Sequence, residues 1–176
     1  MQMTGPARVV VFLEELYNEL EFWYPKLRLV ESGASVTVAG PKAGAVCRSK
    51  VGLPATADVA FEDVDPAEVD GLVIPGGYAP DRIRRNSAAL EIVRNVHQRR
   101  RPLAFICHAG WVPVSAGILQ GRTVTSYHSI RDDLVNAGAT WVDKPLVVDG
   151  HLVSSRTPED LPAFCAAFLN LLATST

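Results

Sequence analysis

The chain has 176 residues, of which 48% are hydrophobic and 20% are charged, and these values are close to the average for a soluble globular protein. This composition excludes a disordered chain, a collagen-like fibre and a coiled coil, and the length suits one compact domain. Seventeen Lys and Arg residues against nineteen Asp and Glu residues give a net charge of −2. Because proteins that bind the phosphate backbone are normally far more basic, we expect no nucleic-acid partner.

The ends and the cysteines of the chain bear on its location. Residues Met1–Arg8 lack the basic segment and apolar run of a signal peptide, and no stretch approaches the roughly 18 apolar residues of a membrane span. The three cysteines, Cys47, Cys107 and Cys165, are odd in number and far apart, which favours neither a disulfide framework nor a zinc site. We therefore expect a cytoplasmic protein with no membrane partner, no metal and no cofactor.

The first half of the chain alternates strands with helices. Continuous apolar runs predict buried strands over 8–13, 35–39, 70–74 and 102–106. A helix over 19–32 is indicated by apolar residues three and four positions apart: Leu20, Tyr24, Leu27 and Val30. A second helix over 87–99 is expected to turn inward Ala88, Ile92, Val93 and Val96. The segment 40–57 is predicted as a loop with room for a small hairpin.

The second half continues the alternation. It is predicted to contain a helix over 109–116, a strand over 123–126, a helix over 132–137, strands over 146–148 and 151–153, and a helix over 157–172. Asp149-Gly150 is typical of a hairpin turn, and Thr157 is expected to cap the last helix. This order predicts an α/β fold, a doubly wound, flavodoxin-like three-layer sandwich around a mostly parallel sheet. We expect a single domain over 1–176, with a core of about 8–173.

Cys107 has a distinctive place in this order, directly after a predicted buried strand and before a predicted helix. A nucleophile on such a tight turn is exposed above the sheet edge. Because a helix N-terminus favours the thiolate, we expect a lowered pKa for Cys107. A shift from about 8.5 to roughly 5.5 would make the side chain almost wholly thiolate at pH 7. The alternative is a small buried apolar residue, which is how we interpret Cys47 and Cys165.

The segment Ala104–Trp111, with the sequence AFICHAGW, resembles the nucleophile elbow of the PfpI-like proteins in the DJ-one/PfpI superfamily. Further segments resemble other blocks of that family in the same order, from about Val9 to Leu171: Leu20–Pro25, Val73–Asp81, Thr125–Tyr127, Arg131–Gly138 and Ser154–Pro158. The resemblance implies a class I glutamine amidotransferase-like fold and a cysteine nucleophile.

The resemblance also implies the residues around this cysteine. Glu21 matches an acidic residue that hydrogen-bonds the nucleophile; the alternative is a solvated glutamate. His108 matches a histidine that pairs with Cys107. Asp81, where several relatives carry glutamate, matches an acidic residue that reaches this histidine from the neighbouring subunit, so the resemblance implies a homodimer or a higher homo-oligomer. The alternative for Asp81 is a cap at the start of a helix or a surface partner of Arg82 or Arg84.

Other positions match the family's binding pocket. Gly76 and Gly77 permit the close backbone approach that a side chain would block, and by resemblance the N–H groups of Gly77 and His108 form an oxyanion hole. Tyr127 matches a pocket residue whose hydroxyl helps proton transfer. His128, where the archetypal sequence has proline, either extends this relay or faces solvent.

Two further histidines, His97 and His151, are interpreted as solvated. No spacing of His, Cys and Asp residues in the chain suggests a structural metal site.

These residues suit an enzyme that needs no cofactor and acts on small reactive carbonyls. By resemblance this is chemistry of the glyoxalase III or protein deglycase type, in which methylglyoxal becomes lactate. One alternative is an intracellular cysteine peptidase, since a thiol, a histidine and an oxyanion hole serve both reactions. Another is a non-catalytic stress protein that senses oxidants through a sulfinic acid at Cys107. His108 favours an enzyme, because a sensor needs no adjacent acid–base group.

Overall fold

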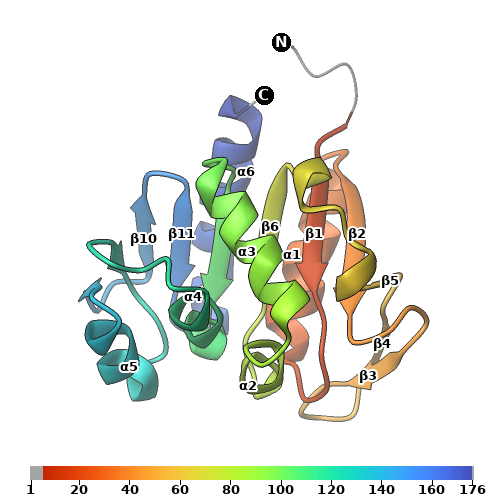
Figure 1. Ribbon diagram of the computed structural model, residues 1–176, viewed down its shortest axis with the longest axis horizontal. Coiled ribbons are helices and arrows are strands. Elements are labelled where there is room, and N and C mark those ends of the chain that lie inside the picture. The colour runs from red at the N-terminus through yellow and green to blue at the C-terminus, as the bar shows by residue number, and fades with distance from the viewer. Residues whose placement is uncertain (1–5, 176) are drawn as a thin grey trace.

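The computed structural model of the protein describes residues 6–175 and contains a seven-stranded sheet (Figure 1). Its strands are, in spatial order, β10 (Leu146–Asp149), β11 (Leu152–Ser155), β7 (Leu103–Ile106), β6 (Gly71–Ile74), β1 (Arg8–Phe12), β2 (Ser35–Gly40) and β5 (Val59–Ala60). All neighbours are parallel except β10, which pairs with β11 in an antiparallel hairpin. The predicted doubly wound α/β fold is confirmed.

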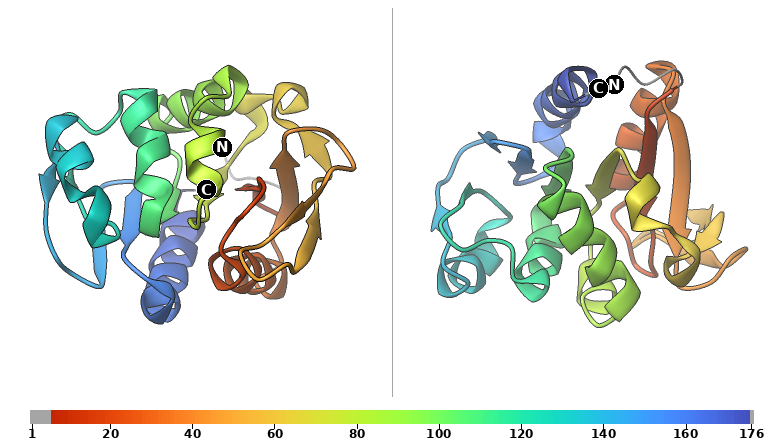
Figure 2. Two further views of the ribbon diagram at one scale, coloured as in Figure 1. Left: turned by 90° about the horizontal axis from the view of Figure 1, so that it is seen from below. Right: turned by 45° about the horizontal axis from the view of Figure 1, so that its top comes forward.

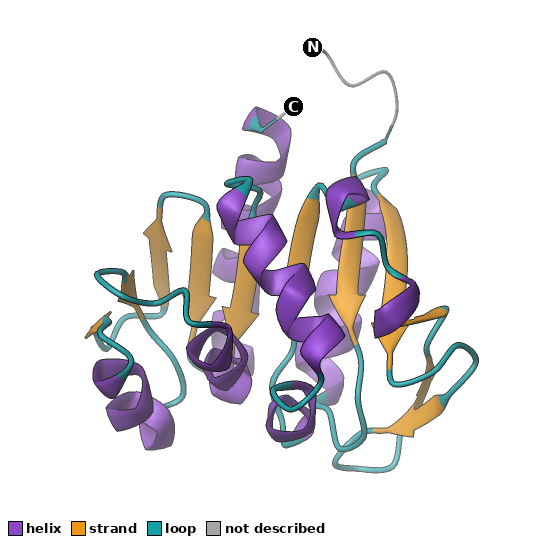
Figure 3. Ribbon diagram, viewed as in Figure 1, coloured by secondary structure: helices purple, strands orange, loops and turns teal. Residues whose placement is uncertain are grey.

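The central strands are apolar on both faces because helices cover both faces of the sheet. α1 (Glu19–Glu31) and α6 (Leu161–Thr174) lie behind the sheet in Figure 1, whereas α3 (Ser87–Gln98) and α4 (Trp111–Ala116) lie in front of it (Figure 3). The short helices α2 (Ala79–Ile83) and α5 (Arg131–Asn136) lie beyond the carboxyl ends of the strands.

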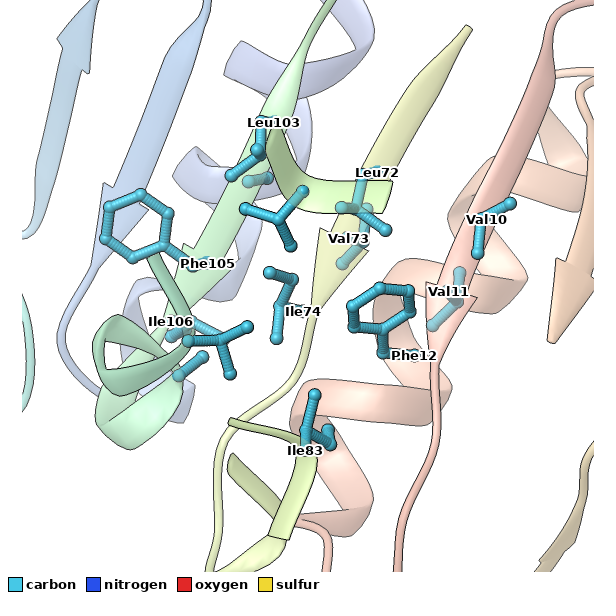
Figure 4. Packing of buried hydrophobic residues seen from close by; sticks show 14 of the residues in the cluster. Val10, Val11, Phe12, Leu72, Val73, Ile74, Ile83, Leu103, Phe105 and Ile106 are labelled. Carbon is cyan, nitrogen blue, oxygen red and sulfur yellow. The ribbon is translucent and has the colours of Figure 1, made fainter. Parts of the chain in front are cut away.

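The core lies in this three-layer arrangement. Every residue of β6 and β7 is buried, and so are four of the five residues of β1. Figure 4 shows side chains from these three strands packed together, with Ile83 of α2 below them. Burial of the large side chains, about 1.5–3 kcal/mol each, therefore joins the three strands whose ends carry the site.

Most predicted elements are confirmed to within two residues. The structure differs at the predicted strand 123–126, at the hairpin turn, in the helix predicted over 109–116 and at the start of α6, and α2 and β5 were not predicted. The expected hairpin in 40–57 exists as β3 (Val46–Arg48) and β4 (Pro54–Thr56). The strand predicted over 123–126 is only β8 (Thr123–Val124), which pairs with β9 (Thr140–Trp141) outside the main sheet. The hairpin loop is Gly150-His151, because Asp149 still pairs with Leu152.

The predicted helix over 109–116 is likewise divided, into a 3-10 turn over Cys107–Gly110 followed by α4. Similar 3-10 turns occupy Phe61–Asp63, Pro66–Glu68, His128–Ile130 and Pro158–Asp160. The last of these precedes α6, and Thr157 makes no capping hydrogen bond there. Thr157 thus occupies the predicted N-cap position, with Pro158 after it, but its side chain caps no N–H group. The carboxylate of Asp160 accepts hydrogen bonds from the backbone N–H and guanidinium of Arg156.

Helix α1 turns to solvent the apolar residues whose spacing indicated it. Leu20, Tyr24, Leu27 and Val30 are exposed, whereas the buried side chains are Glu21, Phe22, Pro25 and Leu29. The helix is therefore confirmed, but the buried face contains a carboxyl group and the exposed face contains the apolar stripe.

The chain changes direction within the sheet next to β1. It runs from β1 to β2 on one side and then returns to β6 on the other side. In open α/β sheets, ligands bind outside the carboxyl ends of the strands at such a switch point. The left view of Figure 2 looks onto this end of the sheet, where the segments that follow β1, β6 and β7 meet.

No helix within residues 6–175 is long and apolar enough to cross a membrane.

Candidate active site

Cys107 occupies a strained turn at the carboxyl end of β7. Its φ is +61°, a left-handed conformation that is uncommon for residues other than glycine and that clusters at functional sites. The strand ends at Ile106, and the 3-10 turn Cys107–Gly110 begins at once. The side chain is therefore lifted out of the sheet above its edge, as in a nucleophile elbow, although only 8% of the residue is exposed.

The neighbouring turn after β6 lies in close contact with this elbow. A Cβ atom on Gly76 would lie 2.8 Å from the Cβ of Cys107 and 2.9 Å from the carbonyl oxygen of Ile106. Gly77 has a φ of +87°, and a Cβ atom there would meet the backbone of residues 16–18. Both glycines are thus required by close backbone approach, which agrees with the expectation from the sequence.

Two backbone N–H groups, those of Gly77 and His108, donate hydrogen bonds to the Cys107 sulfur. They come from different turns, one after β6 and one after β7, so the parallel pairing of these strands brings them together. Such a pair of fixed donors can stabilise negative charge on the sulfur or on an oxygen that is bonded to a carbon beside it.

Glu21 reaches the same place from the buried face of α1. The helix begins at this register because Asn18 caps it, accepting hydrogen bonds from the N–H groups of Leu20 and Glu21. Oε2 of Glu21 accepts a hydrogen bond of 2.9 Å from the N–H of Gly76. Burial raises the pKa of this carboxyl to about 7, with opposing contributions from the Gly76 N–H and from Cys107. A carboxyl with this pKa holds a proton for part of the time at neutral pH.

The predicted lowering of the Cys107 pKa is wrong. Burial, together with the negative charge of Glu21, raises the pKa of this thiol to about 12, although the N–H groups of His108 and Gly77 act in the opposite direction. A 3-10 turn of four residues and a short α4 follow the cysteine, and their N–H groups do not outweigh the loss of water around the sulfur. Burial therefore favours the thiol form of the resting side chain.

His108 is placed to accept the proton of this thiol. Its Nδ1 lies 3.2 Å from the sulfur of Cys107. Burial lowers the pKa of His108, and the positive charge of Lys50 lowers it further. The imidazole is consequently neutral at physiological pH and can act as a base.

Three side chains that hold the His108 ring come from the segments around it. Tyr127 stacks on the ring with a centroid distance of 4.9 Å, and Trp111 contacts it edge-on at 5.3 Å. The hydroxyl of Ser129 lies 3.0 Å from Nε2 of His108. Trp111 and Ser129 were not predicted as site residues. The signal that could have indicated Ser129 is a hydroxyl residue two positions after Tyr127.

Two of the predicted site residues lie apart from this group within the described chain. The carboxylate of Asp81 is exposed on α2 and makes no hydrogen bond or ion pair with residues 6–175. His128 is exposed and faces Trp141 at 6.2 Å between ring centroids. In this part of the chain we find no hydrogen bond from His128 to His108.

The histidines interpreted as solvated are partly buried. Nε2 of His151 lies 3.0 Å from Nδ1 of His97, and burial together with the charge of His97 lowers the pKa of His151 to about 4. Cys47 and Cys165 are buried free thiols, as expected for structural residues. Among residues 6–175, no cluster of three or more His, Cys, Asp or Glu side chains could hold a metal ion.

The comparisons with known proteins place this geometry in a family. The model of the DJ-1/PfpI family matches residues 7–171. A protein of Pyrococcus abyssi named as a deglycase is 46% identical over 165 residues, which is 94% of this chain and 99% of that protein. Deglycase PfpI of Pyrococcus furiosus is 46% identical over 156 residues, which is 89% of this chain and 93% of that protein.

Solved structures agree. Drosophila melanogaster DJ-1beta is 28% identical, covers 95% of this chain and 91% of its own, and has a TM-score of 0.88. The chain belongs to the DJ-1/PfpI family.

Proposed function

We propose that this protein is an enzyme of the deglycase type that uses Cys107 to attack small reactive carbonyls, such as methylglyoxal, and their early adducts on other molecules. The observation that carries the proposal is the arrangement at Cys107. A neutral imidazole nitrogen at 3.2 Å and two backbone N–H groups converge on the sulfur of the Cys107 thiol. The names of the Pyrococcus relatives support the same reaction class.

The first step follows from the proton positions. The sulfur of Cys107 adds to the aldehyde carbon of methylglyoxal, and its proton passes to Nδ1 of His108. The carbonyl oxygen gains the electron pair and becomes an oxyanion next to the N–H groups of Gly77 and His108. These donors supply electrostatic stabilisation where charge develops, an effect worth about 3–4 kcal/mol per donor in well-studied cases.

The remaining steps balance without any external oxidant or reductant. Proton transfers through His108 convert the adduct into a thioester of lactate. Glu21, whose pKa is about 7, serves as a second acid–base group. The former aldehyde carbon is oxidised and the neighbouring ketone carbon is reduced. Water then cleaves the thioester, releases lactate and restores the thiol.

Peptide hydrolysis is the second candidate. It is favoured by the 36% identity to YraA of Bacillus subtilis, whose name marks it as a candidate cysteine protease. The same thiol, imidazole and N–H groups would serve acyl transfer. The third hypothesis is a non-catalytic sensor in which Cys107 is oxidised. It assigns no role to the imidazole that contacts the sulfur.

The deciding experiment measures the D- and L-lactate formed from methylglyoxal by the purified protein. Replacement of Cys107 by Ala is expected to reduce the rate to background, while Cys47→Ala, which removes another buried thiol, is the matched control. Equal background rates for all three proteins would contradict the proposal. A panel of fluorogenic peptides and intact-mass measurement after peroxide treatment would then test the two alternatives.

We further propose that the protein is a cytoplasmic homodimer or larger homo-oligomer. The cytoplasm is supported by the three free cysteines, which suit a reducing compartment. The oligomer is supported by four large apolar side chains that α1 turns to solvent: Leu20, Tyr24, Leu27 and Val30. In such an assembly, Asp81 of one subunit would be free to approach the site of another.

A further inference from the structure

Ser129 lies at the one nitrogen of His108 that the cysteine does not occupy. Its Oγ is 3.0 Å from Nε2, while Nδ1 is 3.2 Å from the sulfur of Cys107. The two segments are tied together by the backbone, because the N–H of Tyr127 donates to the carbonyl oxygen of Cys107 at 3.1 Å. The 3-10 turn His128–Ile130 follows immediately and carries the serine.

The imidazole is therefore held on its faces as well as at its nitrogens. Tyr127 stacks almost parallel to the ring, with an angle of 25° between the planes, and Trp111 meets it edge-on at 65°. Trp111 is itself fixed by a 2.7 Å hydrogen bond from its indole N–H to Asp133. These contacts set the plane of the ring, and the hydrogen bonds set its rotation within that plane.

A hydroxyl at this position differs chemically from a carboxylate. A carboxylate only accepts hydrogen bonds and thus stabilises the charged imidazolium, whereas a serine hydroxyl can accept or donate. When the thiol donates to Nδ1, the proton of the neutral ring is on Nε2 and is donated to Ser129. When the ring has its proton on Nδ1, Ser129 can donate to Nε2 instead. The hydroxyl consequently suits either position of the ring proton.

We propose that Ser129 is a positioning residue for His108 in this protein, so that a hydroxyl group of the same subunit orients the general base through Nε2. This inference rests on the proposed function only in taking Cys107 and His108 as the reacting pair. The competing candidate is Asp81 of a second subunit, since its exposed carboxylate makes no hydrogen bond or ion pair with residues 6–175.

The proton balance of this arrangement is complete. As the sulfur bonds to a carbon electrophile, the thiol proton moves to Nδ1, and the imidazolium retains its Nε2–H bonded to Ser129. The proton on Nδ1 is later returned to the oxygen of the adduct or to the medium. Lys50 and, through the sulfur, Glu21 are the charged groups that act on this pair.

The test measures the rate at which iodoacetamide alkylates Cys107 across the neutral pH range, followed by intact mass. Ser129→Ala is compared with Ser129→Thr, which keeps the hydroxyl at this exposed position, and with Ser87→Ala, an exposed serine at the start of α3. Nitrogen-15 NMR of the His108 ring reports which nitrogen carries the proton, with His108→Gln used for assignment. Neither readout needs a carbonyl substrate, so a failed proposed function would not affect the result.

We expect Ser129→Ala to slow alkylation by about two- to tenfold, the range corresponding to the loss of one hydrogen bond, and to broaden or shift the Nε2 signal. Ser129→Thr should restore both readouts, and Ser87→Ala should leave both unchanged. The proposal would be overturned by an unaltered rate and ring signal in Ser129→Ala. It would also be overturned by a loss of reactivity in Asp81→Asn that depends on protein concentration while Ser129→Ala retains the full rate.

Discussion

The buried carboxyl of Glu21 makes the stability of this protein depend on pH below neutrality. Its pKa rises from an ordinary 4.5 to about 7 because the folded chain removes it from water. Between these two values the folded state holds a proton that the unfolded state has lost. Folding therefore binds a proton in this window, and the contribution of Glu21 to stability decreases as pH rises from 4.5 to 7.

Glu21→Gln is expected to remove this slope, because glutamine does not titrate and can still accept the hydrogen bond from Gly76. The free energy of unfolding of the variant minus that of the natural chain should increase by on the order of 2–3 kcal/mol between pH 4.5 and pH 7. Urea denaturation at several pH values measures the difference. Glu31→Gln, an exposed change at the end of α1, is the control, and a constant difference between the Glu21 variant and the natural chain would contradict the assignment.

A substitution at Gly76 tests how closely the turn after β6 approaches the turn after β7. Gly76→Ala would bring a methyl group against Glu21, the Cβ of Cys107 and the carbonyl of Ile106. We expect the free energy of unfolding to fall by about 1–3 kcal/mol, as for other overpacked sites, and alkylation of Cys107 to change. Gly110→Ala meets only side-chain ends of Ile130 and Leu134, at 3.2 Å, and should cost less. Equal costs for both variants would argue against the tight contact.

At the scale of elements, the His97–His151 contact joins the end of α3 to the loop between β10 and β11. The pKa of His151 falls from 6.5 to about 4 in the folded chain. As pH falls from 6.5 to 4, the unfolded state takes up a proton that the folded state does not, so stability decreases with acid. This slope is opposite to that of Glu21 within the shared window, and only single variants can separate the two contributions.

In His151→Gln, the decrease in the free energy of unfolding with acid is expected to be smaller than in the natural chain. The difference is about 1–2 kcal/mol after allowance for screening at this half-buried position. The measurement is again urea denaturation, at pH 7.5 and pH 5. His128→Gln is the matched control, because His128 is exposed. An identical loss of stability with acid in the natural chain and in His151→Gln would show that the contact carries no such free energy.

Helix α1 shows what a pattern of residues can and cannot predict at this scale. The spacing of Leu20, Tyr24 and Leu27 correctly indicated a helix, because a period near 3.6 defines one. The spacing does not say which face is buried, since an apolar stripe can cover the core of its own chain or be left for another surface. Glu21 was selected among four nearby glutamates by family resemblance and not by spacing.

For the whole molecule, the exposed stripe on α1 leads to a prediction about assembly. A helix face with several large exposed apolar side chains is typical of an interaction surface. We expect light scattering after size exclusion to give at least a dimer, and Leu27→Glu to shift it toward the monomer. Leu27 is 59% exposed, so the fold should survive. Val148→Glu on the edge strand β10 is the control; if it dissociates the assembly and Leu27→Glu does not, the interface lies elsewhere.

Local patterns of residues are enough to predict most of the strands and helices in order, the doubly wound class and the turn at Cys107-His108, because a periodic run or a turn after a buried strand is a local feature. The place of Gly76-Gly77 beside that turn was predicted from the family resemblance. The surroundings of the cysteine depend on long-range contacts of the folded chain. Burial against Glu21 raises the pKa of the thiol that its place before a helix was expected to lower. Ser129, 21 residues from His108, meets the imidazole because the segment after β8 folds back over the elbow. Solvent exposure and contacts between distant segments set these properties, and neither is encoded in the local spacing of residues.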